Sequence, residues 1–114
     1  MTPPLRGHLY WAVLPGDKRR PVLVLSPNVR NERAHDVIVA PLTTTLRPSP
    51  THVRLRRREA GVRAASVVAC ERITTLEREV LDPRPLGGPL SAERMNEVAK
   101  AVLRSIGVPI EPID

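Results

Sequence analysis

Aromatic residues, cysteine and lysine are all scarce in this chain of 114 residues. It has no phenylalanine, one tryptophan and one tyrosine, so valine and leucine must fill the core, which favours β-strands. The single cysteine, Cys70, excludes an internal disulfide framework and fits a reducing compartment. No apolar run approaches the length of a membrane span, and the first ten residues lack a signal-peptide pattern. We therefore expect a cytoplasmic protein without membrane association.

The positive charge of the chain comes almost entirely from arginine. Sixteen of the eighteen basic residues are arginine, and with twelve acidic residues the formal net charge is +6. A guanidinium forks onto phosphate and stacks on bases, whereas an ammonium acts as a point charge, so this bias favours a polyanionic partner. The same composition also arises in a soluble protein from an arginine-rich genome. Composition alone leaves both interpretations open.

The length fits one domain, residues 1–114, and its apolar pattern predicts a mainly β fold. The run "PVLVLS" predicts a central strand covered on both faces, and Pro41 predicts an edge or a bulge in the third strand. In "THVRLRR" the apolar residues alternate with basic ones, as in a half-buried strand. We expect a small, strongly curved, mostly antiparallel sheet with strands at 8–14, 21–26, 36–43, 51–57 and 66–76.

The C-terminal part of the chain predicts an amphipathic helix over residues 91–106. Ser91 is a suitable N-cap and Gly107 a C-terminal stop. Between them one apolar stripe repeats at intervals of three and four residues, which is typical of a helix packed on one face. Its members are Met95, Val98, Ala99, Val102, Leu103 and Ile106.

Most familiar kinds of catalytic site are poorly supported. The three histidines, His8, His35 and His52, lie far apart and have no cysteine partner, so we predict no metal and no cofactor. No serine stands in a nucleophile elbow, no glycine-rich loop cradles a nucleotide, and Cys70 lies within an apolar strand, where a buried, inert thiol is expected. What remains is phosphate chemistry without a metal.

Two polar groups border neighbouring strands and are candidates for that chemistry. Arg19 and Arg20 precede the second strand, and Thr43 ends the third. Strands adjacent in sequence usually lie close in a sheet, so these residues could converge at one rim. A guanidinium can clamp a phosphate and stabilise charge in its transition state, and RNA supplies its own nucleophile in the 2′-hydroxyl. Taken alone, the residues fit a solvated turn and a plain strand end equally well.

As an ordered set, the motifs of this chain resemble the MazF/PemK-like toxins of bacterial type II toxin–antitoxin modules. The resemblance covers residues 6 to 81 and is completed by a compatible C-terminal helix. It implies an SH3-like small barrel of about five to seven strands, a homodimer, and an inhibitory partner, the cognate antitoxin. The motifs are "RGHLYWAVL", "RRPVLVLS", "NVRNER", "VIVAPLTTT", "PTHVRL" and "SVVACERITTLEREVL".

The resemblance also implies an activity and its residues. The family cleaves single-stranded RNA without a metal and leaves a 2′,3′-cyclic phosphate and a 5′-hydroxyl. By carry-over, Arg20 stabilises the scissile phosphate and assists proton transfer, and Thr43 hydrogen-bonds the phosphate oxygens. Glu71 matches a residue that contacts RNA in relatives, and the loop from Thr44 to Pro50 matches one that borders the RNA path. We add Arg19, Thr45 and Arg72 as RNA-binding candidates, although Arg19 also fits an exposed residue, and Thr44 and Thr45 a simple extension of the hydroxyl cluster.

This chain departs from the family pattern in ways that predict an altered cleavage sequence. Its first loop, "PGDKRR", is short and lacks the histidine and glutamine of many relatives, leaving Asp17 or Lys18 as substitutes. Arg72 stands where many relatives carry a glutamine, and arginine only donates hydrogen bonds. A catalytically weakened relative that binds RNA or an antitoxin therefore remains an alternative.

A second alternative is a CcdB-like toxin that binds DNA gyrase. The aromatic C-terminal tail on which such proteins depend is absent from "GVPIEPID", which favours RNA. The arginine run Arg56–Arg58 fits a solvated surface first, although it could also guide RNA by its charge. His52 is expected to be a satisfied structural histidine, and Trp11 a packing or dimer residue more than a base-stacking one.

Overall fold

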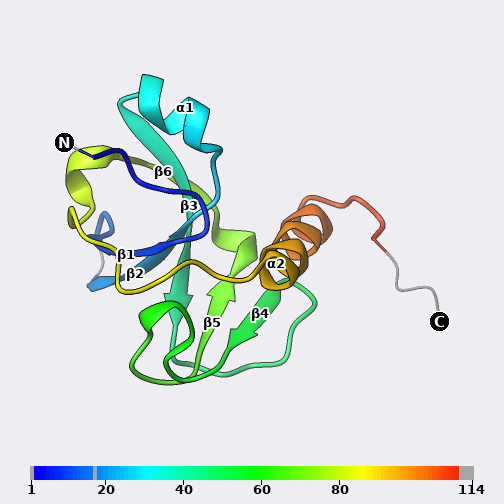
Figure 1. The fold of residues 1–114 in the computed structure, drawn as a ribbon. Coiled ribbons are helices and arrows are strands. Elements are labelled where there is room, and N and C mark those ends of the chain that lie inside the picture. The colour runs from blue at the N-terminus through cyan, green and yellow to red at the C-terminus, as the bar shows by residue number, and fades with distance from the viewer. Residues whose placement is uncertain (1, 17, 111–114) are drawn as a thin grey trace.

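The computed structural model describes residues 2–16 and 18–110 and shows an antiparallel sheet with a C-terminal helix (Figure 1). The strands are β1 (Leu9–Val13), β2 (Arg19–Val24), β3 (Asp36–Thr43), β4 (His52–Leu55), β5 (Ser66–Ala69) and β6 (Thr74–Glu77). The helices are α1 (Asn28–Arg33) and α2 (Ala92–Ser105), with 3₁₀ turns at Glu59–Gly61, Cys70–Arg72 and Arg78–Val80. The predicted mainly β, mostly antiparallel fold with a C-terminal helix is confirmed. A single domain over 1–114 stays a prediction.

Strand β3 joins the two parts of the sheet. The strand order is β1-β2-β3-β5-β4, and β6 also pairs with β3. β3 pairs with β6 over Asp36–Val39 and with β5 over Leu42–Thr43. The sheet is open yet curled around β3, which is compatible with the small barrel that we predicted (Figure 1).

Pro41 does not mark an edge strand, as one alternative of the prediction had it, because β3 is the central strand. Pro41 pairs with Val22 of β2, and on its other side it lies between the residues that pair with β6 and those that pair with β5. Proline lacks a backbone N–H, so this changeover between two partner strands suits it.

The predicted fifth strand is also different, because residues 66–76 do not form one element. After Ala69 the chain makes the 3₁₀ turn Cys70–Arg72 and then leaves β4 to pair with the other end of β3 as β6. Polar residues follow Ala69 in the sequence, and the turn is where the side chains become exposed. The break separates Glu71 and Arg72 from the strand and places them at the rim.

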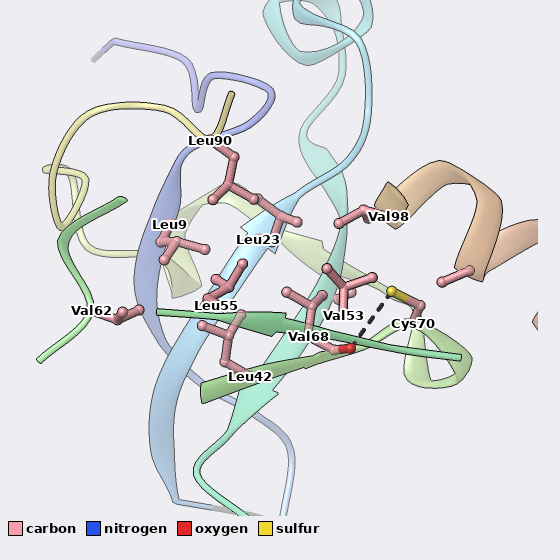
Figure 2. Packing of buried hydrophobic residues seen from close by; sticks show 12 residues of the cluster. Leu9, Leu23, Leu42, Val53, Leu55, Val62, Val68, Cys70, Leu90 and Val98 are labelled. Atoms are coloured by element: carbon pink, nitrogen blue, oxygen red, sulfur yellow. Dashed lines mark hydrogen bonds between the residues drawn. The ribbon is translucent and has the colours of Figure 1, made fainter. Parts of the chain in front are cut away.

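Strands β1, β2 and β3 are covered on both faces, as predicted for "PVLVLS". Successive residues of β2 are fully buried and alternate between two clusters, with Leu23 in one and Val22 and Val24 in the other. In the first cluster, leucines and valines come together from the sheet, from the loop before α2 and from α2 itself (Figure 2). The second cluster lies on the opposite face, where Leu76 of β6 and Leu81 complete it.

Helix α2 forms where it was predicted. The Ser91 side chain accepts a hydrogen bond from the Arg94 amide, and Gly107 adopts a φ of +88° directly after the helix end. Val98 and Ala101 are the buried residues of the helix, whereas Leu103 and Ile106 of the predicted stripe are exposed. The contact face is therefore narrower than the stripe.

The segment that follows β6 is irregular and runs along the outer side of β1. Its backbone donates from Asp82 to the Trp11 carbonyl (2.8 Å) and from Leu86 to the Leu9 carbonyl (2.8 Å). A single bridge joins Leu81 to Ala12. This segment carries Asp82 and Arg84 to the end of the sheet at which β2 begins.

Candidate active site

Arg20, near the start of β2, and Thr43, at the end of β3, line the same two cavities. The last paired residues of the β2–β3 register are Val22 and Pro41, and Arg20 and Thr43 each lie two residues beyond them. Both side chains therefore share one face of the sheet. The Arg20 Nη1 atom is 3.5 Å from the carbonyl oxygen of Leu42, the residue before Thr43. The two predicted catalytic residues are thus brought together at one rim.

Two cavities adjoin at this pair. The larger has a volume of about 600 Å³ and the smaller about 310 Å³, and Arg20, Leu42 and Thr43 line both. Together they form a depression on either side of Arg20 and Thr43. An extended chain molecule could therefore cross Arg20 and Thr43 with one of its units in each cavity.

The larger cavity is bordered by a stacked and paired arginine. The Arg19 guanidinium lies over the Trp11 ring at 4.7 Å from its centroid and donates to Asp82 Oδ2 at 2.6 Å. Trp11 and Arg19 lie diagonally across the β1–β2 pair on the same face, which allows the stacking. Arg19 is therefore held by two partners and does not extend freely into solvent. Asp82 supplies a carboxylate that the sequence did not indicate.

The smaller cavity contains a carboxylate held by two side chains. Glu71 Oε1 accepts from the Thr51 hydroxyl at 3.0 Å, and Glu71 Oε2 lies 3.1 Å from His52 Nε2. Partial burial acts to raise the pKa of Glu71, but hydrogen bonds from its own backbone amide, His52 and Thr51 outweigh burial. The pKa of Glu71 therefore lies below its usual value, and its carboxylate is ionised at neutral pH.

His52 is satisfied through both ring nitrogens, as expected of a structural histidine. Nδ1 lies 3.3 Å from the Arg47 carbonyl oxygen, and Nε2 faces Glu71. Each ring nitrogen therefore has an oxygen partner, one from the loop before β4 and one from the turn after β5. The function of His52 in this geometry is to orient the Glu71 carboxylate.

The remaining predicted residues line the same two cavities. Thr43 Oγ1 accepts from the Thr45 amide at 3.1 Å, which fixes the turn after β3. Thr44 lines the larger cavity, whereas Thr45 and Arg72 line the smaller one. Lys18 also borders the larger cavity, and Asp17 lies outside the described residues. The five other predicted site residues thus line the two cavities that Arg20 and Thr43 share.

Sequence reasoning missed several residues that line the cavities. Arg63, Asp82 and Arg84 border the larger cavity, and Arg47 borders the smaller. They come from irregular segments, for which periodicity gives no signal. Thr51 and His52 could have been assigned from the motif "PTHV", which begins strand β4, because β4 pairs with the strand that leads to Glu71.

Other chemistries find little support in the part of the chain that the structure describes. Residues 2–16 and 18–110 contain no group of three histidine, cysteine or acidic side chains placed to hold a metal ion. Within the same ranges, no helix has the length and apolar character needed to cross a membrane. Cys70 is buried, and desolvation together with the nearby Glu71 charge raises its pKa to about 12. Its thiol is therefore a poor nucleophile.

The chain belongs to the family of PemK-like, MazF-like toxins of type II toxin–antitoxin systems. Residues 5–106 match that family's sequence pattern, which confirms the resemblance drawn from the motifs. The prediction of an endoribonuclease toxin is confirmed at the level of this family.

Individual relatives support the assignment. The endoribonuclease MazF4 of Mycobacterium tuberculosis is 32% identical over 109 residues, which cover 96% of this chain and 98% of that protein. An endoribonuclease from a mycobacterial species, solved in complex with its cognate antitoxin, is 32% identical with a TM-score of 0.81 and covers 95% and 99% of the two chains. The M. tuberculosis toxin MazF-mt6 is 31% identical with a TM-score of 0.80 and covers 90% and 99%.

Proposed function

We propose that this protein is a toxin that cleaves single-stranded RNA without a metal ion and leaves a 2′,3′-cyclic phosphate and a 5′-hydroxyl. The observation that carries the proposal is that Arg20 and Thr43 both line each of the two adjoining cavities. A phosphodiester placed on this pair has room for a nucleotide on each side.

The geometry fits transesterification by the RNA's own 2′-hydroxyl. The 2′ oxygen attacks the adjacent phosphorus, the bond from phosphorus to the 5′ oxygen breaks, and the proton lost at the 2′ oxygen is balanced by one gained at the 5′ oxygen. Arg20 donates to the non-bridging oxygens and stabilises the charge that builds on them, and Thr43 donates from its hydroxyl. A guanidinium stays protonated, so Arg20 serves as donor and not as base.

The two cavities supply the contacts that hold the strand. Arg19, Thr44 and Lys18 border one nucleotide position. Thr45, Glu71 and Arg72 border the other. Glu71, fixed by His52 and ionised, can accept from the exocyclic amino group of a base, whereas Arg72 can only donate. This pairing of an acceptor with a donor underlies the altered cleavage sequence that we expect.

We further propose that the toxin acts in the cytoplasm as a homodimer and is held inactive by a cognate antitoxin. A similar mycobacterial endoribonuclease was solved with its antitoxin, and the chain is also 28% identical to MazF of Deinococcus radiodurans, solved with MazE, at a TM-score of 0.77. An acidic antitoxin segment would complement the basic residues around the cavities. The relatives favour RNA over the gyrase alternative.

The test is incubation of the purified protein with a long RNA of mixed sequence in the presence of EDTA. We expect discrete cuts, each with a cyclic phosphate on one side and a 5′-hydroxyl on the other. Loss of cleavage in EDTA would reveal a metal-dependent reaction and contradict the mechanism. Intact RNA in every buffer, with the protein still binding RNA, would establish the weakened relative instead.

A further inference from the structure

Four exposed arginines lie beside the larger cavity on two segments that are distant in sequence. Arg57, Arg58 and Arg63 belong to the connection between β4 and β5, and Arg84 belongs to the segment that follows β6. We call these four residues the arginine flank. Within residues 2–16 and 18–110, none of the four forms an ion pair. Their charges are therefore available to a polyanion.

The arginine flank is continuous with the candidate active site. Arg63 and Arg84 line the larger cavity together with Arg20 and Thr43. A further cavity of about 410 Å³ is lined by Arg57, Arg58 and Arg63 and shares Gly61 and Val62 with the larger one. Arg63 lines both cavities, so it lies between Arg20 and Thr43 on one side and Arg57 and Arg58 on the other.

The connection that carries three of these arginines is held in a strained conformation. Arg58 and Ala60 adopt φ values of 74° and 53°, a region that residues with a Cβ rarely occupy. Glu59, between them, accepts from the Arg56 amide at 2.9 Å and from Arg94 of α2 at 2.7 Å. The one acidic side chain of the connection is thus turned toward α2.

A second contact fixes the connection against the segment that carries Arg84. Gly61 has a φ of +95°, and a Cβ at this position would overlap the backbone of Leu86 and Gly87. The two backbones therefore touch, which only glycine allows here. This contact sets Arg63 and Arg84 on the same cavity although 21 positions separate them in the chain.

We propose that the arginine flank is a second phosphate-binding stretch, which holds the RNA backbone beyond the nucleotides around the scissile phosphate. The inference rests on the proposed function. An RNA strand anchored at Arg20 and Thr43 must leave the larger cavity, and the flank is the basic exit that adjoins it. Guanidinium groups bind phosphate oxygens without reading bases, so this stretch adds affinity and salt dependence and no sequence preference.

The test compares two substrates and two charge-matched variants. One RNA spans only the mapped cleavage sequence, and the other extends it by about ten nucleotides on each side, enough for several more phosphate contacts. The first variant is Arg57→Gln/Arg58→Gln, at the two positions of the arginine flank that lie outside the larger cavity. The control is Arg33→Gln/Lys100→Gln, which removes the same charge from exposed positions on α1 and α2 that line none of these cavities.

For the long RNA, the slope of log kcat/KM against log salt concentration should be shallower in the flank variant by about 1.4, because each lost contact on a single strand contributes about 0.7. A fourfold rise in salt concentration would then lower kcat/KM of the wild type by about sevenfold more than that of the variant. The control variant should keep the wild-type slope. On the short RNA all three proteins should cleave alike.

Several outcomes would overturn the inference. If the wild type cleaves both RNAs and the flank variant keeps the wild-type slope on the long one, the flank does not hold RNA. If the variant loses binding to a synthetic peptide of twenty glutamates but keeps its salt slope on RNA, the flank serves an acidic protein segment instead. If the wild type cleaves neither RNA, the proposed function itself fails.

Discussion

The Arg20 guanidinium reaches across the β2–β3 pair to the carbonyl oxygen of Leu42, with 3.5 Å between Nη1 and O. Leu42 precedes Thr43, so the contact aims the guanidinium at the end of β3 where the threonine hydroxyl lies. A guanidinium carries five N–H donors, and one bond to a carbonyl can orient the group while others meet a phosphate. Such an arrangement places charge in advance of the reaction, which is where electrostatic catalysis gains most.

Replacing Thr43 by valine should slow RNA cleavage by about 10- to 100-fold, since one hydrogen bond to the charged transition state is lost. The two side chains have nearly the same shape, and Thr43 is only half-buried, so the melting temperature should barely change. Thr43→Ser should restore most of the rate because it keeps the hydroxyl. Thr74→Val, at an exposed position on β6, is the matched control and should cleave as the wild type does. Equal loss in valine and serine variants would argue against a hydrogen bond.

The Glu71 carboxyl should titrate below its ordinary value of 4.5. Carbon-13 NMR of the carboxyl group, followed from pH 7 to pH 2, measures this directly. In His52→Leu the pKa of Glu71 should rise, because a hydrogen bond and a neighbouring positive charge that favour the ionised carboxylate are removed. An unchanged titration in that variant would show that His52 does not hold the carboxylate.

Glu59→Gln should destabilise the protein by about 2 kcal/mol, because it breaks a charged hydrogen bond between partly buried partners. Burial acts to raise the pKa of Glu59, but bonds from Arg94 and the Arg56 amide lower it below the ordinary 4.5. Because the pKa of Glu59 is lower in the folded protein than in the unfolded one, its ionised carboxylate stabilises the fold. This stabilisation is complete at pH values above the unfolded-state pKa and is lost as the pH falls through the folded-state pKa.

Urea unfolding at several pH values checks this prediction for Glu59. The difference between wild type and Glu59→Gln should be constant near neutral pH and should shrink below about pH 4.5. Glu97→Gln removes the more exposed partner of Arg94 and should cost about 0.5 kcal/mol or less. An equal loss of unfolding free energy in the two variants would contradict the prediction that the more buried Glu59–Arg94 pair contributes more than the Glu97–Arg94 pair.

Cys70 should resist thiol reagents in the folded protein. With the pKa raised to about 12, roughly one thiol in ten thousand is ionised at pH 8, and the side chain is fully buried. Reaction with Ellman's reagent should therefore be negligible in native buffer and stoichiometric in guanidinium chloride. Rapid native labelling would show that the turn Cys70–Arg72 opens readily.

The regular elements could be predicted because their signals are local. Val22 to Val24 form an unbroken apolar run, and each is fully buried in a strand covered on both faces. Ser91 and Gly107 carry the conformational signals that start and end a helix, and the helix forms between them. Arg20 and Thr43 were placed together by the adjacency of their strands, which the register of β2 and β3 supports.

Other features depend on long-range contacts that no local pattern records. The exposed Leu103 and the buried Ala101 reverse what the apolar stripe of α2 indicated, because the sheet contacts only a narrow face of the helix. Asp82 forms an ion pair with Arg19, which lies 63 residues earlier in the chain. The segment that carries Asp82 is positioned by backbone hydrogen bonds to β1. Arg63 and Arg84 line one cavity because Gly61 lets the backbones of their two segments touch.

The most direct test of the account measures single-turnover cleavage of a mapped RNA in EDTA by the wild type, by Arg20→Ala and by Arg33→Ala. Arg33 is an exposed arginine on α1 and controls for lost charge and for contaminating nuclease. We expect Arg20→Ala to keep its fold by circular dichroism and to cleave about 10²- to 10³-fold more slowly at the same sites, with Arg33→Ala unchanged. Cleavage at the wild-type rate by Arg20→Ala would contradict the assignment of this site.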